Sequence, residues 1–145
     1  MVHYPEREEE QLFMFYGMLN LHQLSELIEF PNLDKDATVE NKVEYLRSKS
    51  VALTAMGQRR VYGSKHACIM EDPASHLKTY GVFLTNDQAR STDEFEKVGV
   101  YYDRVTVPVV IHRPGREDEE STAQVYKMTQ ETIEAEISSG LVHED

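Results

Sequence analysis

The sequence predicts an α+β protein in which a small mixed β-barrel, closed or nearly closed, is flanked by helices. Short strand-like stretches alternate with turn residues between residues 50 and 128. In other segments the apolar residues recur at helical spacing, namely at 21–29, 38–48 and 86–97. Short strands that curl into a barrel share one core, and helices cover its outside.

The length and composition fit one domain. The chain has 145 residues, of which 40% are apolar, and this is enough for a single core. We expect the domain to span residues 11–139. A flexible N-terminal lead-in is expected at 1–10, where Pro5 opposes regular structure, and a C-terminal tail at 140–145.

The charge limits the classes of partner. The chain has 15 basic and 26 acidic residues, and its net charge of −11 repels nucleic-acid phosphates and anionic membranes. No apolar stretch approaches the length of a membrane span, and the N-terminus lacks the features of a signal peptide. We therefore expect a cytoplasmic protein with a small-molecule substrate, and its oligomeric state stays open. Local positive groups for an anionic ligand are Arg59, Arg60, Lys78 and Arg104.

The first part of the chain predicts a strand, a tight turn and two helices. The apolar run at 11–16 is rich in residues that favour strands, and a glycine follows it. The helix expected at 21–29 ends at a proline. Thr38 or Asp36 is expected to cap the second helix, 38–48.

The middle of the chain predicts short strands separated by turns. Glycine at 57 and the pair Asp72-Pro73 are turn signals. We expect the strands at 51–55, 59–62, 66–70 and 78–84.

The last part of the chain predicts a helix, two long strands and a final helix. Thr85 and Gln88 form a capping-box pattern for a helix that ends near Lys97. A strand at 101–111 contains Pro108, which implies an edge position or a bulge because proline cannot donate to the ladder. A returning strand at 122–128 and a helix at 129–139 follow.

Three motifs lie where these elements end or begin. They are Tyr16-Gly17-Met18-Leu19, Thr92-Asp93-Glu94-Phe95-Glu96-Lys97 and Tyr102-Asp103-Arg104. Together they resemble the gamma-glutamylcyclotransferase-like (AIG2-like) family, which has a Tyr-Gly-(Thr/Ser)-Leu turn, a Leu-Asp-x-(Phe/Tyr)-Glu-Gly helix end and a Tyr-x-Arg. The sequence departs from that pattern at Met18, at Lys97 and at residues 66–69, where the family has a proline.

The resemblance implies a gamma-glutamylcyclotransferase-like fold with a catalytic site at the mouth of the barrel. Glu96 matches the catalytic acid/base of the family. The implied enzyme is an acyltransferase or cyclase that closes a γ-glutamyl amine or peptide to 5-oxoproline and releases the amine. Backbone N–H groups of the loop would hold the substrate carboxylate and steady the oxyanion. The substrate-binding residues would be Tyr16, Gly17, Met18, Leu19 and Tyr102.

The residues around Glu96 carry further expectations. A carboxyl group acts as a base near neutral pH only when its pKa is raised. We expect an apolar wall to raise it, made by Phe95, Val98 and Val100. Lys97 is expected to point outward. Arg104 is expected to pair with a carboxylate of its own strand pair.

Two alternatives stay open, and no cofactor or metal is expected. The fold could serve an enzyme redeployed to cyclise or isomerise another small molecule, or a module that binds without catalysis. Cys68 is the single cysteine, and the six histidines lack metal-ligand spacing. The stretch Gly63-Ser64-Lys65 lacks the earlier glycine that a phosphate loop requires.

Overall fold

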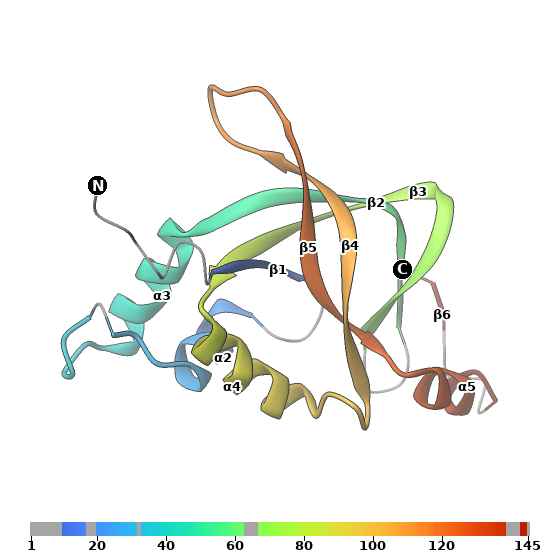
Figure 1. Ribbon diagram of the computed structural model, residues 1–145, viewed down its shortest axis with the longest axis horizontal. Helices are drawn as coiled ribbons and strands as arrows, with labels where there is room; N and C mark the ends of the chain where they lie inside the picture. Colours follow the sequence, from blue (N-terminus) through green and yellow to red (C-terminus); the bar gives the residue numbers. More distant parts are fainter. Residues whose placement is uncertain (1–9, 17–19, 32, 63–66, 139–142, 145) are drawn as a thin grey trace.

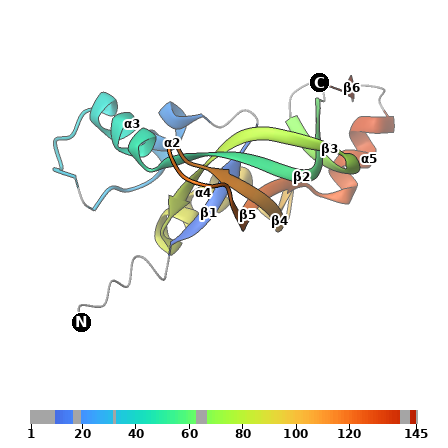
Figure 2. The same cartoon turned by 90° about the horizontal axis from the view of Figure 1, so that it is seen from above.

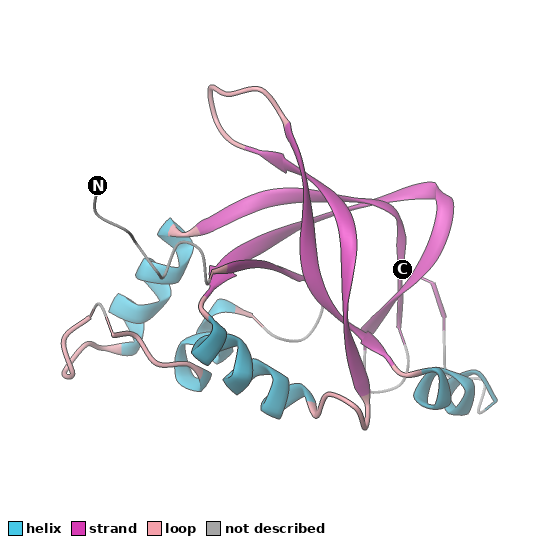
Figure 3. Cartoon of the chain, in the orientation of Figure 1, coloured by secondary structure: helices cyan, strands magenta, loops and turns pink. Residues whose placement is uncertain are grey.

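The computed structural model describes residues 10–16, 20–31, 33–62, 67–138 and 143–144. Five strands form a closed barrel, shown in Figure 1 and Figure 3. They are β1 (Gln11–Phe15), β2 (Ser50–Tyr62), β3 (Ala67–Leu84), β4 (Tyr102–His112) and β5 (Glu119–Met128). The barrel order is β3-β1-β5-β4-β2, and an additional pairing of β2 with β3 closes it.

The barrel is mixed because one of its pairings is parallel. Strand β1 runs parallel to β5, with Phe13 opposite Gln124. The other four barrel pairings are antiparallel. A short strand, β6 (His143–Glu144), adds to β2 beside Val61 and Tyr62. The predicted closed mixed barrel is therefore confirmed.

Four described helices lie outside the barrel: α2 (Leu21–Leu27), α3 (Val39–Ser48), α4 (Asn86–Glu96) and α5 (Gln130–Ser138). The predicted capping box of α4 is present, with Thr85 and Gln88 exchanging side-chain and backbone hydrogen bonds. Helix α3 is capped by Thr38 rather than Asp36. Figures 1 and 2 both place α3 and α5 at opposite ends of the barrel.

The middle of the chain forms two long strands where four short ones were expected. Met56 pairs with His76 and Gln58 with Glu71, so Gly57 faces the segment 72–75. Gly57 has a φ of +69°, a left-handed conformation that glycine adopts without a steric cost. The expected turns are therefore a bulge within a continuous pair of strands.

The Asp72 side chain organises the wider side of this bulge. Its Oδ1 accepts a hydrogen bond from the Ala74 N–H at 3.1 Å, and its Oδ2 accepts one from the Ser75 hydroxyl at 2.9 Å. An aspartate that bonds its own backbone two residues on is a typical turn former. The pair Asp72-Pro73 therefore does form a local turn, as predicted, but the strand continues in the same direction after it.

Pro108 lies where β4 loses one of its neighbours. The pairing of β4 with β2 stops at Val109, while the pairing with β5 continues past Pro108 to Tyr102. The proline therefore occupies a local edge, as predicted. Strand β5 starts at Glu119, earlier than the expected 122, so Glu119 and Glu120 belong to the strand.

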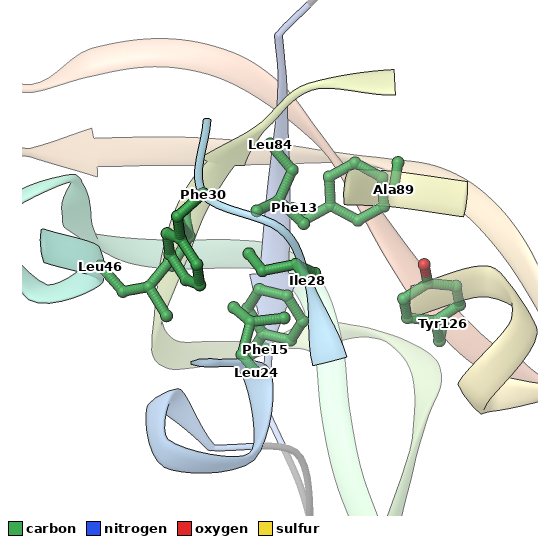
Figure 4. Close-up of a cluster of buried hydrophobic side chains, with 10 residues drawn as sticks. Phe13, Phe15, Leu24, Ile28, Phe30, Leu46, Leu84, Ala89 and Tyr126 are labelled. Carbon is green, nitrogen blue, oxygen red and sulfur yellow. The ribbon is translucent and has the colours of Figure 1, made fainter. Parts of the chain in front are cut away.

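The side chains of β1 divide between two hydrophobic clusters. Phe13 and Phe15 face the helices, where Figure 4 shows Phe13 among side chains of α2, α3 and α4. Leu12 and Met14 face the barrel interior, with side chains of β2, β3, β4 and β5. All four residues are buried, so β1 joins the barrel core to the helical layer.

Gly81 of β3 packs against β1 and β2 so closely that a larger residue does not fit. A Cβ atom at this position would lie 2.7 Å from Leu53 Cδ1, 2.9 Å from Leu12 Cδ1 and 2.9 Å from the Phe13 carbonyl oxygen. We expect Gly81→Ala to lower the free energy of unfolding by about 1–3 kcal/mol, because backbone atoms must move to admit the methyl group. Urea denaturation followed by circular dichroism measures the change.

Gly115→Ala is the matched control. Gly115 has a φ of +70° and open space around it, so this substitution introduces backbone strain without a clash. The strain should cost about 1 kcal/mol. Equal denaturation midpoints for wild type and Gly81→Ala would show that the close packing does not constrain the barrel.

Candidate functional site

Glu96 is the last residue of α4, and a backbone motif fixes its position. Lys97 follows in the left-handed conformation, with a φ of 52°. The Lys97 N–H donates to the Glu94 carbonyl at 3.2 Å, and the Val98 N–H donates to the Asp93 carbonyl at 3.1 Å. These two bonds form a Schellman motif, which usually has glycine at the left-handed position. The glycine of the family motif therefore has a conformational role, which Lys97 fulfils here under strain.

The chain turns back directly after Lys97, and Tyr102 therefore lies beside the end of α4. The Val100 and Tyr101 N–H groups donate to the Lys97 carbonyl at 2.9 and 3.2 Å. The Gly99 N–H donates to the Tyr102 carbonyl at 2.7 Å. The backbone of this turn is therefore held by its own hydrogen bonds.

The Glu96 side chain is half-buried, and its acidity is changed. Burial raises the pKa of Glu96 from its ordinary value of 4.5 to about 7, because water no longer solvates the charged form fully. The negative end of the helix dipole acts in the same direction. A carboxyl group with this pKa can both take and return a proton near neutral pH.

Tyr16 lies directly after β1, and its hydroxyl donates a hydrogen bond to the Tyr126 carbonyl. Burial is the largest cause that raises the pKa of Tyr16 well above its ordinary value. Charges on neighbouring groups raise this pKa further or lower it. Those that raise it are Cys68, Tyr102 and Glu96, and Arg60 lowers it.

These four groups come from three strands of the barrel and from one helix. Arg60 lies on β2, Cys68 on β3 and Tyr102 at the start of β4, while Glu96 ends α4. Each of them affects the ionisation of Tyr16, so each lies within electrostatic range of its hydroxyl. Two of them, Glu96 and Tyr102, are residues that the sequence predicted for the site together with Tyr16. Gly17, Met18 and Leu19 lie outside the described residues.

The residues expected to form an apolar wall beside Glu96 do not do so. Phe95 is 51% exposed, Val98 39% and Val100 60%. Consecutive residues at a helix end point in different directions. When one of them faces the barrel, its neighbours in sequence face solvent. The burial of Glu96 comes from tertiary packing. Lys97 is exposed as expected, and its ammonium lies 5.5 Å from the centroid of the exposed Tyr101 ring.

Arg104 forms its ion pair with a different element from the one expected. Its Nη1 lies 3.1 Å from Oδ2 and 3.3 Å from Oδ1 of Asp93, which belongs to α4 and not to the β4–β5 pair. Its guanidinium also lies 5.4 Å from the centroid of the Phe13 ring. The arginine of the Tyr-x-Arg motif therefore ties the end of α4 to the barrel.

The sequence analysis missed the role of Asp93. Its carboxylate accepts a hydrogen bond from the Tyr126 hydroxyl at 2.7 Å as well as those from Arg104. The sequence did contain one signal for Asp93. It lies three residues before Glu96, and this spacing places the two carboxylates on the same side of the helix. Acidic residues in a helix are ordinarily solvated, so this spacing alone did not single out Asp93.

The described residues contain no group of three or more histidine, cysteine, aspartate or glutamate side chains arranged to hold a metal ion. None of the described helices is long and apolar enough to cross a membrane.

Lys97→Gly should stabilise the protein. Glycine adopts the left-handed conformation without the steric cost that lysine meets, and this relief should raise the free energy of unfolding by about 1 kcal/mol. Lys97→Ala is the matched control, since it also removes the contact with Tyr101 but keeps a Cβ atom. Chemical denaturation of both variants measures the difference. A Lys97→Gly variant no more stable than Lys97→Ala would contradict the proposed strain.

Glu96→Gln should change how stability depends on pH. The folded-state pKa of Glu96, about 7, lies above the ordinary 4.5, so the folded state holds a proton that the unfolded state releases between these values. The wild type therefore loses stability as pH rises through this window, by at most about 3 kcal/mol. At pH 8 the variant should be more stable than the wild type, and at pH 5 the difference should largely disappear.

The control for this measurement is Glu94→Gln, which removes an exposed carboxylate from the same helix. Urea denaturation at several pH values compares the three proteins. If the Glu96→Gln variant and the wild type keep the same stability difference from pH 5 to pH 8, the carboxylate is not buried as described.

No family model and no curated protein matches this sequence. Solved structures do match it. An Arabidopsis thaliana protein, solved in solution, is 19% identical with a TM-score of 0.54, over 84% of this chain and 70% of that one. An AIG2-like protein from Mus musculus is 17% identical with a TM-score of 0.53, over 86% of this chain and 83% of that one.

A third structure, described as a gamma-glutamyl cyclotransferase, is 17% identical with a TM-score of 0.50. It matches 83% of this chain over 68% of its own length. Structural similarity at this level of identity establishes the fold. The barrel and its helices therefore have the gamma-glutamylcyclotransferase-like fold that the three sequence motifs indicated.

Proposed function

We propose that the protein is a gamma-glutamylcyclotransferase-like enzyme that cyclises a γ-glutamyl amine or γ-glutamyl peptide, with Glu96 as the acid/base. The observation that carries the proposal is the Glu96 carboxyl group, half-buried at the end of α4 with a pKa raised by burial to about 7. A surface glutamate would be too weak a base for this role. The fold shared with a gamma-glutamyl cyclotransferase and the matching motif around Glu96 support the same activity.

The chemistry requires one group that first takes a proton and then returns one. The Glu96 carboxylate removes a proton from the α-ammonium of the γ-glutamyl unit, and the free amine forms a bond to the γ-carbonyl carbon. The resulting tetrahedral intermediate places a negative charge on the former carbonyl oxygen. The attacking nitrogen, which becomes positively charged in this intermediate, releases its second proton to solvent. Protonated Glu96 then gives its proton to the leaving nitrogen, the oxyanion re-forms the carbonyl group, and the bond from the leaving nitrogen to the γ-carbon breaks. The products are 5-oxoproline and a free amine.

Because both reacting groups belong to one γ-glutamyl unit, most of the catalysis consists of holding that unit folded. In this proposal the loop from Tyr16 to Leu19 binds the α-carboxylate and the oxyanion through backbone N–H groups. Tyr16 and Tyr102 would form the walls beside Glu96. The proposed substrate is thus a small molecule with a γ-glutamyl group, and the leaving amine stays open.

The decisive test is turnover by Glu96→Gln. Glutamine keeps the size of the side chain but cannot accept a proton, so kcat should fall by about 10²- to 10⁴-fold. Formation of 5-oxoproline from a panel of γ-glutamyl amines and peptides is followed by mass spectrometry, with the exposed Glu94→Gln as control. For the wild type, kcat/KM should rise with pH through a limb near 7, because the base must be deprotonated.

Each outcome separates the proposal from its alternatives. Full activity of Glu96→Gln on a substrate that the wild type turns over would show that Glu96 is not the catalyst. A wild type that acts on no γ-glutamyl compound, but converts another small molecule in a Glu96-dependent way, would indicate a redeployed enzyme. Binding of γ-glutamyl compounds without any turnover would indicate a binding module.

A further inference from the structure

Tyr126 of β5 contacts both parts of the site. Its hydroxyl lies 2.7 Å from Asp93 Oδ1 and 2.6 Å from Thr92 Oγ1, both in the last turns of α4. Its backbone carbonyl accepts the hydrogen bond from the Tyr16 hydroxyl. One residue therefore connects the helix that ends in Glu96 to the tyrosine that begins the proposed substrate loop.

The hydrogen bond from Tyr126 to Asp93 affects the backbone turn in which Glu96 lies. The Asp93 carbonyl accepts the Val98 N–H at 3.1 Å, which is one of the two bonds of the Schellman motif. The Asp93 carboxylate is fixed from a second side by Arg104. A shift of Asp93 would therefore displace the turn in which Glu96 lies.

The hydroxyl of Tyr126 stays protonated and can act as a permanent donor. Tyr126 is 4% exposed, and burial, followed by its bond to Asp93, raises the pKa of Tyr126 well above its ordinary value. Its ring packs 6.0 Å from that of Phe13, so the ring and the hydroxyl have separable roles. Removal of the oxygen alone leaves the packing in place.

We propose that Tyr126 is a positioning residue that holds the end of α4, and with it Glu96, in register with Tyr16. It does so by donating to Asp93 while its carbonyl holds the Tyr16 hydroxyl. Its kinetic consequence rests on the proposed function, but the positioning itself can be measured without any substrate. Loss of the hydroxyl should let the end of α4 move and admit water to Glu96.

Several other charged or ionisable groups surround this end of the barrel, and the test leaves all of them unchanged. Asp93 is on the same helix as Glu96. On other elements, Arg60, Cys68 and Tyr102 affect the ionisation of Tyr16, and Arg104 bonds to Asp93. Tyr126→Phe alters no charge at working pH. Any change in the titration of Glu96 then reports its position and hydration rather than a new electrostatic neighbour.

The experiment uses the full chain with ¹³C-labelled glutamate side chains. Carbon NMR follows the titration of Glu96, whose signal is assigned by its absence from Glu96→Gln. We expect the titration midpoint to fall from about 7 by roughly one pH unit or more in Tyr126→Phe, because water then solvates the carboxylate better. Thr92→Val, which removes the other hydroxyl bonded to Tyr126, should shift the midpoint in the same direction by less.

The control is Thr85→Ala, which removes the N-cap at the opposite end of α4. It destabilises the same helix without touching the Asp93 contacts, so the Glu96 midpoint should stay at the wild-type value. With a γ-glutamyl substrate, Tyr126→Phe should lower kcat by about 10-fold or more with little change in KM, and the acid limb of kcat/KM should move with the midpoint.

A folded Tyr126→Phe with the wild-type titration midpoint would overturn the proposal, even if its melting temperature falls as much as that of Thr85→Ala. If Tyr126→Phe does not fold, Thr92→Val decides, and an unshifted midpoint in that variant has the same meaning. A shifted midpoint in a protein that turns over no γ-glutamyl compound would support the positioning role while contradicting the proposed cyclisation.

Discussion

The burial of β1 on both faces is the constraint on which the rest of the structure depends. Its alternating side chains fill two different cores, one inside the barrel and one under the helices. The strand also connects β3 to β5 within the barrel, because it pairs with both of them. A shift of one residue in its register would exchange the two sets of side chains. The position of Tyr16, directly after this strand, is therefore fixed by the packing of the whole domain.

The second part of the site depends on how α4 ends. The left-handed Lys97, the Schellman bonds and the Asp93–Arg104 pair all act on the same turn, and the turn carries two costs. A lysine is strained in that conformation, and the Glu96 carboxylate loses water. Stability alone would favour a glycine at 97 and an uncharged side chain at 96. Such costs concentrate where a group must be held in a particular place and protonation state.

Local signals predicted much of the fold, and their failures have a common cause. The Thr85 cap follows from hydrogen bonds within a few residues, so the sequence was sufficient for it. For α3 the sequence left Thr38 and Asp36 as alternatives, and for Pro108 an edge or a bulge, and the structure decided between them. The predicted apolar wall beside Glu96 was wrong because it was inferred from the neighbours of Glu96 in sequence, and the side chains of these neighbours are exposed. The predicted partner of Arg104 was wrong because it was expected on the neighbouring strand. The actual partner, Asp93, belongs to a helix that packs against the strands.

The sequence by itself determined the helices, most strand positions and the cap of α4, since these depend on local conformational preferences, and a short motif indicated Glu96 as the candidate base. Only the tertiary structure decided that Glu96 is half-buried, that Glu96 and Tyr102 lie within electrostatic range of Tyr16, and that the Tyr126 carbonyl accepts a hydrogen bond from Tyr16. The physical reason is that a pKa depends on the solvent and charges around a group. For Glu96 the cause is the loss of water on burial, which depends on tertiary packing and not on its exposed neighbours in sequence.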